Sequence, residues 1–456
     1  MPKGSNRKRD SFSSSIGFVL SAAGSAIGLG NIWKFPYVAG NSGGGLFLIF
    51  YIAFVIILGV PIILAEIAIG RKTQLSPVLA YNKLKSNWGF IGIIGVVCGF
   101  ILLSYYSVIS GWIIKYIFEY ITGANFGVDK SHFFNSFTQS KFEPIIGHAI
   151  FIFICAVVVI GGIEKGIEKA SKVILPILFI LIIIMTINSL TLSGNKQGLT
   201  FFFVPQKETL SSFKNIISSI IEAMGQVFFS LSLGIGVTIT YGSYLGHDNN
   251  IQKSSISIAL LDTLIALFSG MIVLPAVFSF NIEPSSGPGL IFEALPAVFE
   301  SMSFGNIFGL IFFILIFFAA LTSAIALLEV VCSYVIDKWH IQRKKATIIV
   351  SVLILVSGAV VSLSMGILSH IKLLNMNVFS LFVFLTDKIL MPISAFLMCI
   401  FIGHIIDTNI IIDEIKLGTK RFKMEKAFSY IIKYVAPIII LAIFIIGIID
   451  TISVSI

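Results

Sequence analysis

The chain has 456 residues, of which 57% are hydrophobic and only 12% are charged, and its mean hydropathy is +1.01. Soluble domains carry about 25% charged residues, so this composition excludes a soluble protein and indicates a membrane protein. The net charge of +9 comes mainly from short loops between apolar runs and requires no nucleic-acid partner. The four cysteines lie inside apolar stretches without paired spacing, so neither a disulfide framework nor a zinc site is indicated.

Apolar runs repeat along the chain, and each is long enough to cross a hydrocarbon core about 30 Å thick. Breaks of charge, glycine and proline separate them and predict eleven membrane-spanning helices. These spans lie near 14–37, 44–69, 89–121, 147–162, 173–192, 215–244, 254–280, 305–337, 346–366, 374–403 and 428–450. The predicted fold class is therefore all-α integral membrane, in a single domain over 1–456 that starts with a cytoplasmic segment at 1–13.

The basic residues predict the orientation of these spans. Of the 31 Lys and Arg residues, 21 fall in the N-terminal segment and in alternate loops. The positive-inside bias then places the N-terminus in the cytoplasm, and an odd helix count places the C-terminus outside. The first apolar run lacks a small-residue cleavage pattern, so we expect it to remain in the mature protein, in the plasma membrane.

Two long outward loops interrupt the pattern of short connections. The first, near 122–146, is polar with aromatic residues, and the second, near 281–304, carries Pro284, Gly287 and Pro288 in a half-apolar context. Two interpretations of the second loop stay open: it folds back towards the membrane as a lid, or it forms an ordinary surface loop.

Glycine-rich breaks interrupt two spans in mid-membrane, at 24–31 and at 230–236. They occupy matching places in two five-helix halves, 14–192 and 215–403, which leaves 428–450 as an extra helix; transporters built from inverted repeats have this arrangement. An unwound stretch at this depth is tolerated only where it lines a cavity, because lipid cannot satisfy its amides and carbonyls. A carboxylate suits the amides and a cation suits the carbonyls. The alternative is close helix packing on small residues.

Polar side chains inside other spans are further candidates. Thr322 and Ser323 offer adjacent hydroxyls as hard ligands for a small cation, although such groups often bond back to their own helix. Asp262 lies inside the seventh span, where an ionisable group is either functional or a buried structural acid with a partner. Glu66 of the second span is favoured as a structural acceptor of hydrogen bonds from unwound backbone.

Several longer motifs together resemble the neurotransmitter:sodium symporter family. They are GLGNIWKFPY at 28–37, FFSLSLG at 228–234, TYGSY at 240–244 and FAALTS at 318–323. The resemblance covers nearly the whole chain. With its eleven predicted helices, the chain looks like the bacterial branch of the family, which imports amino acids with sodium. It implies alternating access, in which a bundle of helices 1, 2, 6 and 7 moves against a scaffold of helices 3, 4, 8 and 9.

The resemblance also implies two sodium sites and a substrate site. One sodium site would use Gly24, Ile27, Ala319, Thr322 and Ser323. The other would use Ala26, Asn31, Ser230 and Asp262, with the carboxylate of the substrate as a further ligand. The substrate would contact Ala26, Gly28, Leu29, Gly30, Leu102, Tyr106, Phe229, Ser230, Ser232, Ile235, Ser323 and Leu327. The mostly apolar lining favours a hydrophobic or aromatic amino acid.

The seventh span departs from family members that need chloride. Those place a hydroxyl four residues after a sodium-ligating Asn, whereas this chain has Asp262 and Ala266 there, while Tyr51, Gln226 and Ser230 match the rest of the chloride pocket. A carboxylate that balances the sodium charge would replace the anion, so we predict chloride independence. We further hypothesise that Asp262 picks up a proton on the return step.

The gates are predicted from the same resemblance. At the outer gate Lys34 replaces the usual Arg, and Ser380 and Val383 replace the expected acids, so no clear ion pair is expected; Asp387, one turn further on, would pair only under a shifted alignment. At the inner gate Arg9 and Asp337 match the family pair.

Two further features are assigned from the resemblance. Phe12 replaces the usual Trp near the inner gate. The Gly166 and Pro176 spacing suggests either local unwinding of the fifth span or an ordinary loop glycine followed by a helix-start proline.

Three other classes of protein are alternatives to a sodium symporter. A proton-coupled or uncoupled carrier of the same fold, or an amino acid sensor that does not translocate, would share the motifs. An enzyme is disfavoured, because the six histidines lack metal-ligand spacing and no nucleophile and base arrangement is present. The expected partners are the amino acid and membrane lipid, with no obligate protein partner.

Overall fold

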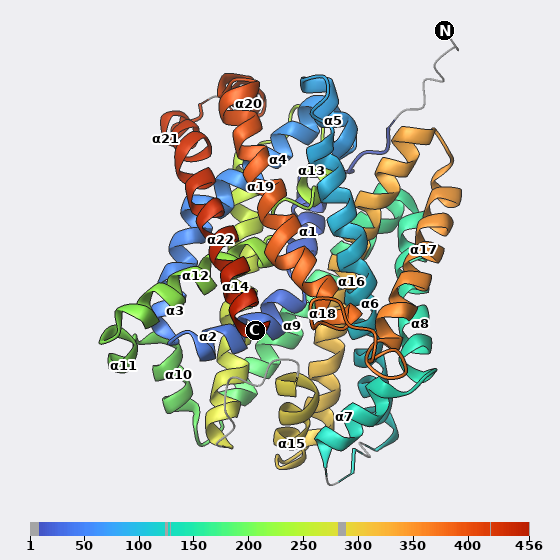
Figure 1. Cartoon of the computed structure of the whole chain (residues 1–456), viewed down its shortest axis with the longest axis vertical. Helices are drawn as coiled ribbons and strands as arrows, with labels where there is room; N and C mark the ends of the chain where they lie inside the picture. Colours follow the sequence, from blue (N-terminus) through green and yellow to red (C-terminus); the bar gives the residue numbers. More distant parts are fainter. Residues whose placement is uncertain (1–8, 124–125, 128, 281–288, 420, 456) are drawn as a thin grey trace.

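The structure, a computed structural model, describes residues 9–123, 126–127, 129–280, 289–419 and 421–455. Over these residues the chain is helical apart from turns, bends and two isolated bridges. Figure 1 shows the longer helices side by side, each running roughly along the longest axis of the molecule. The predicted all-α membrane fold is confirmed.

The first half of the bundle contains spans one to five. Span one is formed by α1 (Ser15–Ala26), η1 (Gly30–Lys34) and α2 (Phe35–Asn41). Span two is formed by α3 (Gly45–Phe54), η2 (Val55–Gly59) and α4 (Val60–Thr73), and α5 (Pro77–Leu84) follows it. Spans three, four and five are α6 (Phe90–Thr122), α8 (Glu143–Ile160), and η3 (Ile163–Glu168) with α9 (Lys169–Ser189).

The second half contains spans six to ten, and an eleventh span follows. Span six is formed by α12 (Phe213–Ser230) and α13 (Val237–Gly242), and spans seven to nine are α14 (Ile251–Ser279), α16 (Gly305–Trp339) and α17 (Arg343–Leu363). Span ten is formed by α18 (Val378–Phe384), η5 (Leu385–Leu390), α19 (Met391–Ile400) and η6 (Phe401–Ile405). Span eleven is formed by α21 (Glu425–Tyr430), η7 (Ile431–Val435) and α22 (Ala436–Ser455).

Neither helix of the sixth span is long and apolar enough to cross a membrane alone. Within the described ranges, nine helices are long and apolar enough to cross a membrane, and α1 with η1 and α2 adds a tenth that is bent by 50°. Neither α12 nor α13 is among them, because α12 carries charged and amide side chains and α13 has only 6 residues. Together the two helices form span six and bring the count in the described residues to the predicted eleven.

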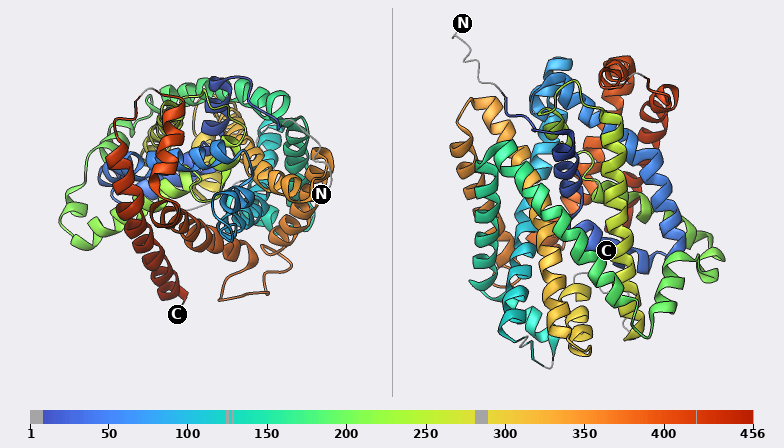
Figure 2. Two further views of the ribbon diagram at one scale, coloured as in Figure 1. Left: turned by 90° about the horizontal axis from the view of Figure 1, so that it is seen from above. Right: turned by 180° about the vertical axis from the view of Figure 1, so that it is seen from behind.

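Short helices cover both ends of the bundle. In Figure 1, α5 and α20 (Thr408–Leu417) lie at one end, and α7 (Lys130–Gln139), α10 (Asn195–Phe203), α11 (Lys207–Leu210) and α15 (Leu295–Glu300) lie towards the other. Seen from above in Figure 2, the C-terminal helix lies at the edge of the bundle. The most apolar windows of α6 and α16 are both 72% buried, against 33% for the eleventh span, so α6 and α16 form the interior.

The second outward loop folds back against the bundle. Its described part forms η4 (Leu290–Ala294) and α15, and the Tyr116 hydroxyl of α6 donates a 2.6 Å hydrogen bond to the Phe292 carbonyl. The Phe292 ring also stacks on Phe134 at 5.1 Å between ring centroids. This packing favours the fold-back interpretation. Residues 281–288, which include Pro284, Gly287 and Pro288, lie outside the described residues.

Candidate functional site

The first span is broken where the glycine pattern predicted it. α1 ends at Ala26 and η1 begins at Gly30. The Gly28 amide donates to Asn31 Oδ1 at 3.0 Å, and the Leu29 amide donates to the Tyr106 hydroxyl at 3.1 Å. In a continuous helix these two amides would serve carbonyls four residues earlier, so the break redirects backbone groups into the centre of the bundle.

The sixth span is broken at a facing position. α12 ends at Ser230 and α13 begins at Val237, and Ser232, Gly234 and Gly236 between them have φ values of 52°, 81° and 87°. These left-handed residues interrupt the span, because a right-handed α-helix cannot continue through positive φ values.

Glu66 of α4 supports this second break. Its carboxylate accepts hydrogen bonds from the Gly234 amide at 2.9 Å and from the Thr238 hydroxyl, and its side chain is buried. The acceptor role expected for this acid is the one observed.

We expect Glu66→Gln to destabilise the protein, because an amide replaces a charged acceptor of two buried donors. The expected loss is about 1–3 kcal/mol of unfolding free energy, seen as earlier thermal unfolding of the purified protein. The control is Glu208→Gln, at an exposed acid of α11. Equal unfolding temperatures for the two variants would contradict the supporting role.

A buried polar cluster joins the two breaks to α14. Asn31 Nδ2 lies 2.9 Å from Ser230 Oγ and 2.8 Å from Asp262 Oδ1, and Ser230 Oγ lies 2.8 Å from Asp262 Oδ2. The Tyr51 hydroxyl reaches Asp262 Oδ2 at 3.3 Å. All four side chains are at most 1% exposed. Three of the four residues predicted for one sodium site therefore meet here, and the fourth, Ala26, ends α1.

A second group of oxygens lies between α1 and α16. The Ser323 hydroxyl donates to the Ile27 carbonyl at 3.1 Å. Thr322 Oγ1 bonds back to the carbonyls of Phe318 at 3.2 Å and Ala319 at 3.1 Å, which was the alternative raised for this residue. Gly24 of α1 abuts Thr322, because a Cβ built on Gly24 would lie 3.3 Å from Thr322 Cβ. The structure thus brings together the five residues predicted for the other sodium site.

The predicted substrate residues surround the first break. A Cβ on Gly28 would lie 2.5 Å from Ser323 Oγ and 2.8 Å from the Tyr106 hydroxyl, and a Cβ on Gly30 would lie 2.8 Å from the Phe229 ring. The backbone of the break therefore faces a hydroxyl on one side and an aromatic ring on the other.

The other predicted lining residues lie in neighbouring helices or in the second break. Leu102 of α6 and Leu327 of α16 are 5% and 4% exposed, and these two helices pack against each other. Ile235, in the second break, touches α6, because a Cβ on Gly95 would lie 2.8 Å from its carbonyl oxygen. Ser232 lies in the same break, with φ of 52°.

At the outer gate the expectation of no ion pair is wrong. Lys34 Nζ lies 2.8 Å from Asp387 Oδ2 and 3.9 Å from the centre of the Phe229 ring. Asp387 lies in η5, four residues after Val383 and seven after Ser380, which places the three residues on one face of span ten. All three line the same cavity, and Asp387 is the one that pairs with Lys34.

A cavity of about 540 Å³ adjoins this pair, and Lys34, Asp387 and Phe229 line it. Its lining also includes Tyr105 and Glu222, which sequence reasoning missed. The Tyr105 hydroxyl lies 3.5 Å from Asp387 Oδ1. The available signal was the presence of acids inside the apolar runs of spans six and ten.

We expect Asp387→Asn to loosen the outer closure over the substrate. The pair is partly exposed and is worth about 1 kcal/mol, so bound labelled amino acid should dissociate about fivefold faster. Lys388→Gln removes a neighbouring cavity charge that is outside the pair and serves as the control. Unchanged dissociation from the Asp387 variant would contradict a closing role.

The inner gate has the predicted pair. Arg9 Nη1 lies 3.0 and 2.9 Å from the two carboxylate oxygens of Asp337, and Arg9 Nη2 donates to Ser243 at 2.8 Å. Phe12 packs edge-on against Tyr241 at 5.7 Å, and its amide donates to the Tyr244 carbonyl at 3.2 Å. This end of the bundle is therefore closed by a charged pair and an aromatic contact.

The fifth span begins earlier than predicted. Gly166 lies in η3 and Pro176 lies inside α9, so the interpretation as a loop glycine and a helix-start proline is wrong. The buried Glu168 carboxylate of η3 accepts bonds from the Ser13 amide at 2.7 Å and from the Ser14 hydroxyl at 3.1 Å. These bonds hold η3 against the start of span one.

Two broken helices that meet around buried polar groups, with a gate on either side, define a multi-pass membrane transporter. A model described as the sodium:neurotransmitter symporter family matches residues 9–141 and 143–455. The chain therefore belongs to the sodium:neurotransmitter symporter family. It is a sodium-dependent transporter and not an enzyme.

Individual relatives agree with this assignment. YhdH of Bacillus subtilis (strain 168), an uncharacterised sodium-dependent transporter, is 39% identical over 446 residues, which is 96% of this chain and 98% of that protein. An uncharacterised sodium-dependent transporter of Haemophilus influenzae is 32% identical over 460 residues, with 96% and 98% covered. The crystal structure of MhsT in complex with L-phenylalanine matches with a TM-score of 0.88 and 39% identity, over 96% of this chain and 100% of that one.

Proposed function

We propose that the protein imports a hydrophobic or aromatic amino acid by sodium-coupled symport, with two sodium sites and no chloride requirement. The observation that carries this proposal is the buried cluster of Asn31, Ser230 and Asp262 beside the broken backbone of span one. It holds one acid and several hard oxygen atoms, which suits a cation such as sodium.

Coupling follows from where the substrate carboxylate would lie. The amides around Gly28 and Gly30 and the Tyr106 hydroxyl would hold it next to Asn31 and Ala26, so that it completes the coordination of the first sodium ion. Each ligand then raises the affinity of the other by the same factor, which is the condition for coupled binding.

The second sodium ion would lie between α1 and α16. The carbonyls of Gly24, Ile27 and Ala319 and the hydroxyls of Thr322 and Ser323 would hold it. The contact between Ser323 and Ile27 at 3.1 Å is the observation in favour, because it links the two helices through oxygen atoms alone.

The substrate class is inferred from the lining. Leu102, Phe229, Ile235 and Leu327 are apolar, and a charged side chain would lose its hydration against them. The MhsT structure with L-phenylalanine supports an aromatic or large apolar side chain.

Chloride independence and proton return both rest on Asp262. Its carboxylate reaches Tyr51 and Ser230, two residues matching the chloride pocket, and supplies the negative charge that an anion would otherwise bring. When sodium leaves, the same carboxylate would take up a proton.

In the membrane, the end of the bundle that carries α5 and α20 would face the cytoplasm, which is the side of the N-terminus.

The test is uptake of labelled amino acids into liposomes that contain the purified protein. An inward sodium gradient should drive phenylalanine accumulation, whereas potassium or choline should not, and replacing chloride with gluconate should change nothing. Uptake that ignores sodium would contradict the two cation sites, and uptake that ignores opposing pH gradients would contradict the proton step.

A further inference from the structure

Span ten contacts two different parts of the molecule along its length. Its outer segments, α18, η5 and α19, pack against α6. Beyond η6 the chain turns at Asp407, whose φ of 72° is rare for a residue with a side chain, and continues as α20. α20 packs against α4, so the two ends of this region rest on different helices.

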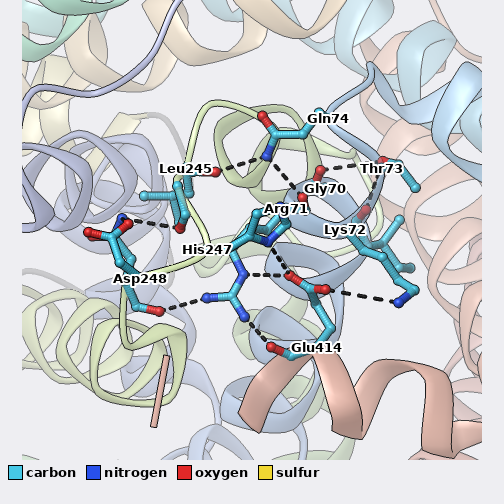
Figure 3. A network of polar contacts seen from close by, with 12 residues as sticks. Gly70, Arg71, Lys72, Thr73, Gln74, Leu245, His247, Asp248 and Glu414 are labelled. Atoms are coloured by element: carbon cyan, nitrogen blue, oxygen red, sulfur yellow. Dashed lines mark hydrogen bonds and ion pairs between the residues drawn. The ribbon is translucent and has the colours of Figure 1, made fainter. Parts of the chain in front are cut away.

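A buried ion pair fastens α20 to α4 (Figure 3). Arg71 Nε of α4 lies 2.7 Å from Glu414 Oε1 of α20, and Arg71 Nη2 donates to the Glu414 carbonyl. The two side chains are 0% and 3% exposed. Two nitrogen atoms of the Arg71 guanidinium thus bind the side chain and the backbone carbonyl of Glu414. A lysine ammonium would not reproduce this fixed geometry.

The same arginine reaches the loop between spans six and seven. Arg71 Nη1 donates to the Asn249 carbonyl at 2.6 Å, and Gln74 Nε2 donates to the carbonyls of Arg71 at 2.9 Å and Leu245 at 2.8 Å. Asn249 also abuts the end of α20, because a Cβ on Gly418 would lie 1.9 Å from its carbonyl oxygen. Three cytoplasmic segments therefore converge on Arg71.

The helix that carries Arg71, α4, packs tightly against α13. A Cβ on Gly70 of α4 would lie 2.0 Å from the Ile239 carbonyl of α13, and one on Gly242 of α13 would lie 2.6 Å from the Ile67 carbonyl. Contacts this close leave no room for sliding, so α4 and α13 behave as one body.

We propose that the ion pair between Arg71 and Glu414, called the Arg71 joint, makes α20 move together with α4 and α13. When these two helices move during transport, α20 follows them, span ten bends, and the position of Asp387 at the outer gate changes. The bend falls at η6 and Asp407, between the part of span ten that rests on α6 and the part that rests on α4. The inference rests on the proposed function, because alternating access supplies the movement. Arg71 and Glu414 are positioning residues, since they act through Asp387 and touch no substrate.

The test reads the outer cavity while the change is made at the cytoplasmic end. Ser380, exposed in the lining of the outer cavity, is replaced with cysteine in purified protein in lipid nanodiscs. The native cysteines are all buried, so labelling by a polar maleimide reports on the new thiol. Labelling rates are compared in potassium and in sodium with L-phenylalanine, and sodium-dependent binding of labelled phenylalanine is measured on the same samples.

In the S380C parent, sodium with phenylalanine should change the labelling rate by about fivefold or more. In the Arg71→Met and Glu414→Met double variant this response should fall below about twofold, although phenylalanine still binds. Removing both charges is chosen because it leaves no unpaired buried ion. Glu414→Gln should show the same loss if the double variant fails to fold.

The matched control is Lys416→Met, on the same helix. Lys416 Nζ lies 2.8 Å from Glu425 Oε2, and the two side chains are 41% and 39% exposed. This ion pair joins α20 to α21, not to α4 or to the loop at Asn249. It should keep the full response. A folded double variant whose labelling responds like that of its parent would overturn the proposed coupling through Arg71 and Glu414. A parent that neither binds phenylalanine with sodium nor changes its labelling rate would overturn the proposed function itself.

Discussion

Replacing Asp262 with asparagine is expected to raise the sodium concentration for half-maximal uptake by about 100-fold. The carboxylate is 0% exposed and bonds to Asn31, Ser230 and Tyr51, so its charge is available to a neighbouring cation without screening by water. Losing one charge of a buried pair costs about 3 kcal/mol, which corresponds to this factor. Sodium titration of phenylalanine uptake measures it.

The same variant should become responsive to chloride. An anion near Tyr51 and Gln226 would restore the missing negative charge, so chloride should lower the sodium requirement while gluconate should not. Glu425→Gln neutralises an acid that is 39% exposed and serves as the control. A variant with an unchanged sodium requirement would show that Asp262 plays a purely structural part.

Replacing Gly28 with alanine is expected to reduce binding of the amino acid by up to about 100-fold, since overpacking a site costs about 1–3 kcal/mol. The added methyl group would lie 2.5 Å from Ser323 Oγ and 2.8 Å from the Tyr106 hydroxyl. One of these side chains must move, and both belong to the proposed ligand shell. Equilibrium binding of labelled phenylalanine in saturating sodium measures the loss.

Gly225→Ala is the matched control, because a Cβ at that position would meet no atom within 4 Å. It makes the same chemical change on α12, a helix of the neighbouring broken span. Normal binding by the Gly28 variant would mean that the amino acid does not lie against this part of the first break.

The sequence predicted the two breaks and the acid between them well, because each has a local signature. Glycine series inside apolar runs mark the breaks, and Asp262 is conspicuous as a carboxylate within a span. Their meeting around Asn31 and Ser230 follows from the family resemblance and from the equal spacing of the halves. The Arg9 and Asp337 pair was found in the same way.

The outer gate pair was missed because the family resemblance placed the expected acids at Ser380 and Val383. Asp387 lies on the same helix face, one turn after Val383, and the distance between neighbouring spans decides that it pairs with Lys34. The start of the fifth span was missed for a different reason: charged residues at 164–169 predict a loop, yet η3 holds them in a helix while Glu168 binds Ser13. The Arg71 joint joins segments more than 300 residues apart, beyond any local pattern.

The broken sixth span also affects how the chain enters the membrane during synthesis. α12 alone is too polar and α13 alone is too short to cross the membrane, so the two must enter it together as one segment. Earlier helices supply their partners: α3 packs along α12, and Glu66 of α4 accepts hydrogen bonds from the amide of Gly234 and the hydroxyl of Thr238. The order of the helices along the chain therefore suits biogenesis, since span two is already in the bilayer when the segment that needs it leaves the ribosome.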